Sequence, residues 1–511
     1  MVGTIYSLIP ALVMLILVLV TRKVLLSLGI GIVLGAFFIH DFHLFDSIKE
    51  VWSVFYEIFV DEGSLNIGNL QLLAFLFLLG IMTAFLQASG GSRAFGDWMM
   101  KRVKTRVGAK MMTAVLGIII FIDDYFASLS VGQIARPVTD RYRISRAKLS
   151  YIIDSTAAPI TVLSPVSSWG AFIIGILGSI FIANEITHVQ PMEAFVRMIP
   201  LNLYALSAIL LVFIVTYLKM DIGLMKVHEE RAIKTGELID PDNSKVPGDL
   251  GDTVESHPHG KVYHLILPIV VLIFSTVLAM VITGANATEG SVTILSIFAN
   301  TDVNLSLLLG GLASVLTGLI LHVIHEKPKA KNSNIFLQGM KSMVPAINIL
   351  ILAWMIGSII STLETGSYLA EVLNNASVSS TYLPFLFFVI SGLMAFSTGT
   401  SWGTFTIMLP IGAEVAMAIE PELLLPTLAA VLAGAVFGDH CSPISDTTIL
   451  SATGAQANII DHVMTQLPYA IIAAVVSAIG YLLIGILDLT IIPLLITLGL
   501  ILIIGLFLNN R

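Results

Sequence analysis

Cysteine and charge are both scarce in this chain. Cys441 is its single cysteine, and charged residues make up 12% of its 511 residues. One cysteine excludes a disulfide framework and any zinc or iron–sulfur site built from several cysteines. The sequence also lacks a Walker A loop, a glycine-rich dinucleotide fingerprint and an HExxH helix, which argues against a nucleotide-driven pump and a membrane metalloprotease.

Long apolar runs dominate what is present. Hydrophobic residues make up 56% of the chain, and the mean hydropathy is +0.93. Apolar stretches of roughly 17–25 residues, each long enough to cross a bilayer, recur along the sequence. Residues 5–20 lack the basic start and the cleavage site of a signal peptide, so we interpret them as the first span. The sequence therefore predicts an all-α polytopic membrane protein with about 11 spans, surrounded by lipid and without a nucleic-acid partner.

Lysine and arginine cluster in a few loops. The basic stretches are residues 22–23, 93–110, 136–148, 219–261 and 327–341, whereas residues 41–69, 364–381 and 420–422 are acidic or poor in basic residues. Because basic loops remain on the cytoplasmic side of a membrane, we expect the first set inside and the second set outside. This threading places the N-terminus outside and the C-terminus in the cytoplasm.

Two segments of the first half do not fit simple spans. Residues 111–131 are apolar but have basic flanks on both sides, so we predict a re-entrant helical hairpin with Asp123 and Asp124 near its tip. Residues 149–182 are too long for one span and are interrupted by Pro159 and by the polar run 164–168. Proline removes a helical hydrogen bond, so this segment predicts a broken helix.

The second half repeats landmarks of the first. Leu86-Gln87 resembles Leu363-Glu364, Phe121 precedes a polar run as Phe396 does, and Ser164-Pro165 resembles Ser442-Pro443, all in the same order and at similar spacing. The pattern predicts a first repeat at 1–218, a cytoplasmic linker at 219–262, a second repeat at 263–487 and an extra helix at 488–511. An odd number of crossings in the first copy inverts the second, with a hairpin at 383–412 and a broken helix at 423–455.

A polar run that lies between two apolar segments of the second half extends from Gly438 to Thr448. It places Asp439 and His440 before Pro443 and Asp446 after it. Carboxylates and the free carbonyls of an opened helix are hard oxygen ligands of the kind that suit sodium. Burial disfavours a charged carboxylate, so such a group can hold either a proton or a cation. We predict a sodium site at Asp439 and Asp446; the alternative is a polar network that only seals the helix break.

Each of the other candidate residues has a structural alternative. Asp123 and Asp124 are adjacent carboxylates, so one should hold a proton or face a cation, unless it caps a helix. Asp154 is either an ion ligand or the partner of an arginine. Hydroxyl groups that could complete an ion or substrate site, or only allow close helix packing, are Ser164, Ser168, Thr398, Ser401, Ser442 and Thr447.

These motifs resemble those of the NhaC-type sodium/proton antiporters. The runs that carry the resemblance are Gly438 to Thr448, Phe121 to Tyr125, Arg136 to Asp140 and Asp154 to Pro159. The resemblance implies a bacterial or archaeal inner-membrane protein of the broad ion-transporter superfamily, in which a homodimer is an expected assembly. That superfamily also includes relatives that exchange or co-transport organic acids or amino acids with sodium.

Residues and resemblance together predict a secondary transporter, not an enzyme, that exchanges sodium for protons by alternating access and needs no cofactor. Sodium would bind Asp439 and Asp446, with Asp123 or Asp124 as a proton or second ion site. The alternative keeps this machinery but moves a small organic acid or amino acid with sodium or protons. Inverted broken-helix repeats argue against a passive channel, and the lack of a nucleophile–base pair argues against an intramembrane hydrolase.

Overall fold

The computed structural model describes residues 1–21, 23–61, 63–121, 123–165, 167–183, 186, 189–241, 257, 259–288, 292–324, 331–365, 368, 371, 379–487 and 489–509. Within these ranges the regular structure is helical, apart from the antiparallel pair β1 (Val60–Asp61) and β2 (Ser64–Leu65). The predicted all-α class is therefore confirmed.

Long apolar helices make this a multi-pass membrane protein. In the described part of the chain, nine helices are long and apolar enough to cross a bilayer. A tenth span results if the bent pair of Pro191–Leu201 and Leu203–Tyr217 counts as one. Helices α1 (Ile9–Thr21) and α2 (Val24–Ile39) fall below this length criterion, although both lie where the sequence predicts spans.

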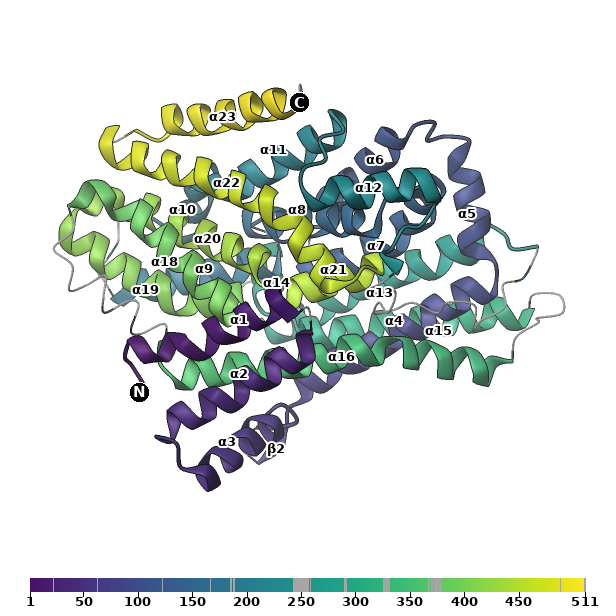
Figure 1. Ribbon diagram of the computed structural model, residues 1–511, viewed down its shortest axis with the longest axis horizontal. Coiled ribbons are helices and arrows are strands. Elements are labelled where there is room, and N and C mark those ends of the chain that lie inside the picture. The colour runs from purple at the N-terminus through teal and green to yellow at the C-terminus, as the bar shows by residue number, and fades with distance from the viewer. Residues whose placement is uncertain are drawn as a thin grey trace.

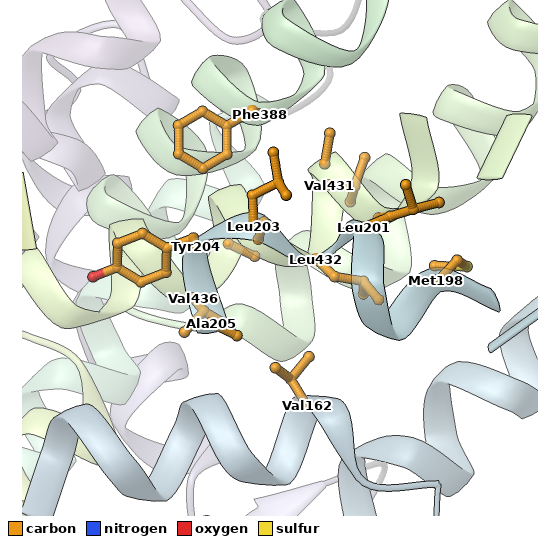
Figure 2. Packing of buried hydrophobic residues seen from close by; sticks show 14 of the residues in the cluster. Val162, Met198, Leu201, Leu203, Tyr204, Ala205, Phe388, Val431, Leu432 and Val436 are labelled. Atoms are coloured by element: carbon orange, nitrogen blue, oxygen red, sulfur yellow. The ribbon is translucent and has the colours of Figure 1, made fainter. Parts of the chain in front are cut away.

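The helices form two packed groups (Figure 1). The first group joins α1 and α2 to α4 (Ile67–Ala88), α13 (Tyr263–Ala287), α15 (Val303–Ile324) and α16 (Asn332–Thr362). The second group joins α10 (Pro191–Met198), α11 (Leu203–Tyr217), α18 (Leu383–Thr398), α19 (Ser401–Ile419), α20 (Leu424–Cys441), α22 (Ile459–Leu487) and α23 (Ile491–Asn509). Each group has its own hydrophobic core, and Figure 2 shows part of the second one around Tyr204, Phe388 and Leu432.

The remaining helices lie at the ends and between the groups. They are α3 (Leu44–Glu57), α5 (Gly91–Met100), α6 (Arg106–Ile119), α7 (Asp124–Arg141), α8 (Arg146–Leu163), α9 (Ser168–Ala183), α12 (Leu224–Thr235), α14 (Ile294–Ala299) and α21 (Asp446–Ala455). Helices α5 and α12, which carry predicted cytoplasmic segments, lie at the right of Figure 1. The N-terminus and α19 lie at the left.

Helices α6 and α7 form the first hairpin. The Arg106 side chain donates to the Arg143 carbonyl over 3.1 Å, and the Tyr142 hydroxyl donates to the Val103 carbonyl. These bonds bring the two basic ends together and leave Asp123 and Asp124 at the opposite end. The hairpin is longer than the predicted 111–131, because both helices continue into their basic flanks.

The second hairpin consists of α18 and α19. It turns at Gly399, whose φ of 71° lies in the left-handed region that glycine adopts without steric cost. A Cβ atom on Gly412 would lie 3.3 Å from the Phe387 ring, so the two helices run back along each other. The tip therefore carries the predicted hydroxyl-rich run from Thr398 to Ser401.

Both predicted helix breaks occur at a Ser-Pro pair. Ser164 separates α8 from α9 with φ −93° and ψ 120°, and Ser442 separates α20 from α21 with φ −86° and ψ 123°. Proline disfavours the helical region for the residue before it. The Ser167 hydroxyl then joins the two ends of the first break, donating to the Thr161 carbonyl at 2.7 Å and accepting from the Gly170 amide at 2.9 Å.

The predicted interruption at Pro159 is wrong. Pro159 lies inside α8, which continues to Leu163. A proline within a helix removes one backbone bond, and packing can hold the flanking turns helical around that loss. At Pro165, a serine is also available to cap the start of the next helix. At Pro159, the sixteen buried residues of α8 favour continuation of that helix.

Candidate ion-binding site

The two hairpin tips and the two helix breaks meet in the interior. Helix α7 packs against α21, α9 against α19, and α18 against α20. A Cβ atom on Gly399 would lie 2.8 Å from the Ile444 carbonyl oxygen, so the second tip contacts the second break. The Trp169 indole donates to Asp124 over 2.9 Å, which joins the first tip to the start of α9.

A cavity of about 480 Å³ opens where these elements meet. Its described lining comprises Asp123, Asp124, Tyr125, Val303, Asn304, Trp354, Gly357, Ser358, Thr398, Gly399, Thr400, Trp402, Ile444 and Asp446. The predicted candidates Asp123, Asp124, Thr398 and Asp446 thus share one cavity, although they come from three separate stretches of the chain.

Asp446 is the first residue of α21 and is partly exposed. Its Oδ1 atom accepts a hydrogen bond from the Thr447 amide at 2.9 Å, and its Oδ2 atom accepts one from the Tyr125 hydroxyl. The helix N-terminus favours a negative charge at this position. Tyr125 therefore links the first hairpin tip to the second helix break through this carboxylate.

Asp124 is fully buried at the start of α7. Its Oδ1 atom accepts the bond from Trp169, whereas its Oδ2 atom has no hydrogen-bond partner among the described residues. A buried oxygen without a partner carries a desolvation cost, which a bound proton or cation would remove. Asp123 is also buried and lines the same cavity.

Asp439 lies beside the cavity without contributing to its described lining. Its carboxylate is buried, with Oδ2 accepting a 2.7 Å bond from the Ser401 hydroxyl and Oδ1 unpartnered among the described residues. Ser401 belongs to the second hairpin tip. The two acidic residues of the second-half motif therefore contact different hairpins: Asp439 contacts the second and Asp446 the first.

Asp154 belongs to a separate buried cluster. Its Oδ1 atom accepts from Ser451 at 3.0 Å, and its Oδ2 atom accepts from Gln466 at 2.5 Å. The His462 ring lies 3.3 Å from the same Oδ2 atom, so the ionic partner of Asp154 is a histidine rather than an arginine. The neighbouring His440 ring is hydrogen-bonded to the Tyr204 hydroxyl at 3.0 Å, and neither carboxylate nor ring lines the cavity.

The other predicted hydroxyl groups bond protein atoms near the helix break and the hairpin tip. Ser442 donates to the Phe396 carbonyl at 2.8 Å, and Thr447 lies 2.8 Å from the Ser445 hydroxyl. Thr398 donates to the Met394 carbonyl at 2.9 Å, although it also lines the cavity. Ser164 is partly buried in the first break, and the Ser168 side chain lies outside the described residues.

Several residues of the site were not predicted. Tyr125 directly follows the two aspartates in the sequence, so its position beside them could have indicated that it belongs to the site. Asn304 and Trp354 reach the cavity from α15 and α16, which are ordinary apolar spans in the sequence. His462 and Gln466 contact Asp154 across some 300 residues of chain, a pairing that periodicity alone does not indicate.

Comparisons with known proteins place the chain in a transporter family. Residues 160–486 match the model of the Na+/H+ antiporter family. The chain is 46% identical to an uncharacterized protein of Haemophilus influenzae (strain Rd), covering 94% of this chain and 91% of that one. It is 28% identical to the malate-2H(+)/Na(+)-lactate antiporter of Bacillus subtilis (strain 168) over 37% of this chain and 39% of the relative.

A second Haemophilus influenzae protein, an uncharacterized Na(+)/H(+) antiporter, is 32% identical over 26% of this chain and 29% of its own length. The family match covers more than half of the chain and includes the second hairpin and both helix breaks. The chain therefore belongs to the Na+/H+ antiporter family and is a membrane transporter rather than an enzyme.

Proposed function

We propose that this protein exchanges sodium for protons across the cytoplasmic membrane by alternating access. The observation that carries the proposal is the contact between Asp446, at the second helix break, and Tyr125, at the first hairpin tip, beside the buried carboxylate of Asp124. Carboxylate, hydroxyl and carbonyl oxygens suit a hard cation such as sodium. A site formed between hairpin tips and broken helices, which can move relative to one another, suits transport of that cation.

The carboxylates supply a mechanism for exchange. Sodium would bind Asp446 and Asp124, with hydroxyl oxygens of the second hairpin tip near them. A proton would neutralise the same carboxylates when sodium is absent, because the unpartnered charge of the buried Asp124 is costly. Sodium and protons therefore compete for one site, and each half of the transport cycle carries one of them. Through its hydrogen bond with Ser401, Asp439 would hold the second hairpin tip in place. Alternatively, Asp439 would become an ion ligand once the hairpins and broken helices have moved.

The arrangement of the two halves supports alternating access. The contact of α7 with α21 has a counterpart in the contact of α19 with α9, which is what inverted repeats would produce. The cavity reaches Val303 and Asn304 at the start of α15, the end that charge places outside. In this topology, with the N-terminus outside and the C-terminus in the cytoplasm, the cavity opens outward.

The proposal is tested by flux in liposomes that contain the purified protein and a trapped pH dye. External sodium should enter in exchange for internal protons and so alkalinise the interior, without any organic solute. Asp446→Asn should remove this response, whereas the matched control Asp46→Asn, on the exposed face of α3, should retain it. Wild-type flux in a correctly folded Asp446→Asn variant would overturn the proposal.

The alternative cargo is a small organic acid or amino acid. The cavity volume falls in the range of small-molecule sites, and the name of the Bacillus subtilis relative includes malate and lactate. The described lining, however, contains three carboxylates and no lysine, arginine or histidine, which opposes an organic acid. Flux that requires sodium together with such an acid would favour this alternative.

A further inference from the structure

The cavity is larger than a sodium ion requires. Its volume of about 480 Å³ lies within the range of roughly 300–1,000 Å³ that is typical of small-molecule sites. Its described lining holds three carboxylates, Asp123, Asp124 and Asp446, without a cationic side chain among them. The local charge therefore selects for a cation, whether inorganic or organic.

Aromatic side chains line the same space. Trp354 from α16 and Trp402 from α19 both contribute to its lining, together with Tyr125 from α7. Trp402 is held in place by the Phe172 ring, whose centroid lies 4.6 Å away. A tryptophan face attracts an organic cation through its quadrupole, and it is the strongest of the natural side chains in this respect. Sodium alone gives no chemical reason for two indoles beside three carboxylates.

A buried polar atom marks where the charge would bind. Asp124 is 0% exposed, and its Oδ2 atom lacks a hydrogen-bond partner among the described residues. Because Asp124 lines the cavity, a positive charge within the cavity would lie near this oxygen and offset its negative charge. The Ser358 hydroxyl and the Asn304 amide add neutral polar atoms to the wall.

We propose that this cavity binds a small organic ammonium ion as a second cargo, with the charge at the carboxylates and the alkyl groups against Trp354 and Trp402. The inference rests on the proposed function, because it assigns a further substrate class to the same ion-binding site. An organic anion would meet three carboxylates, and an uncharged solute would leave them without a counter-charge.

Choline and tetramethylammonium are suitable probes. Each carries a permanent charge, so neither crosses a lipid bilayer as a neutral base and dissipates the pH gradient. The full chain in liposomes with a trapped pH dye would receive either probe outside, in sodium-free buffer. We expect a proton flux driven by the organic cation, and competition between it and sodium when both are present.

Tryptophan variants separate this site from the general transport machinery. The readout is the ratio of choline-driven to sodium-driven flux. Trp354→Leu and Trp402→Leu should each lower this ratio by about tenfold, the order expected for losing a desolvated cation–π contact. Trp52→Leu is the matched control, because Trp52 lies on α3 and is 65% exposed; its ratio should match the wild type.

Each outcome decides the inference. Choline flux or competition that depends on the two tryptophans supports it, even if sodium proves inactive, in which case only the proposed sodium exchange fails. Sodium-driven flux with neither choline flux nor competition overturns the inference and leaves sodium exchange standing. Choline flux with an unchanged ratio in both tryptophan variants also overturns it, and silence with every cation overturns both.

Discussion

Asp124 and Asp154 are both fully buried carboxylates, yet their surroundings differ in one respect. Asp154 is satisfied on both oxygens by Ser451, Gln466 and His462. Asp124 lines a cavity and keeps one oxygen without a described partner. The first arrangement ties α8 to α21 and α22, whereas the second leaves a charge for a ligand to satisfy. Burial of a carboxylate therefore indicates function here only when its hydrogen bonds are incomplete.

Of these two buried carboxylates, Asp124 should have the larger effect on transport. Asp124→Asn should lower sodium-driven proton flux by about 100-fold, since losing a charged ligand worth about 3 kcal/mol changes an equilibrium by that factor. Its thermal stability should remain near that of the wild type, because asparagine can still accept the Trp169 bond. Flux in liposomes and a melting curve in detergent measure the two properties. Normal flux in this variant would show that Asp124, like Asp154, has no direct role in transport.

Asp154 should show the opposite pattern. Asp154→Ala leaves Ser451, Gln466 and His462 without their buried acceptor, which should lower the free energy of unfolding by about 3 kcal/mol. The single cysteine, Cys441, is 5% exposed, so its reaction with a thiol dye during heating reports unfolding. The control is Asp154→Asn, which keeps an acceptor and should lose less. A variant that is stable but inactive would instead place Asp154 in the ion path.

Asp439, like Asp124, keeps one oxygen without a described partner, but it does not line the cavity, so weakening its contacts should give the smallest effect. Ser401→Ala removes its 2.7 Å hydrogen bond, and the apparent sodium affinity should weaken by about fivefold, as expected for about 1 kcal/mol. The matched control is Ser53→Ala, a hydroxyl on α3 that bonds the exposed Glu57. Competition titrations of the flux measure both variants. An effect as large as that of Asp124→Asn would make Asp439 a direct ligand in this state.

The helix breaks and hairpin tips could be predicted because their causes are local. Ser164 and Ser442 leave the helical region before a proline, and Gly399 adopts a left-handed turn. The predicted break at Pro159 was wrong, because a proline within a well-packed helix does not end that helix. The breaks depend on the pre-proline residue and on a serine that caps the next helix, not on proline alone.

The site partners could not be predicted to the same extent because they are distant in sequence. Tyr125 meets Asp446, and Asp154 meets His462, only after the hairpins and breaks have packed. Asp439 and Asp446 are close in sequence, but the break between them directs them to different hairpins. Trp354 lies on an apolar span whose pattern indicates core packing, and only the fold reveals its place in the cavity.

The central claim is that sodium and a proton compete for the carboxylates of one cavity. The most direct test is titration calorimetry of sodium binding to the purified protein in buffers of different ionisation enthalpy, which counts the protons released. The account predicts release of about one proton per sodium bound in the wild type, and neither sodium binding nor proton release in Asp446→Asn. Tight sodium binding without proton release in the wild type would contradict it.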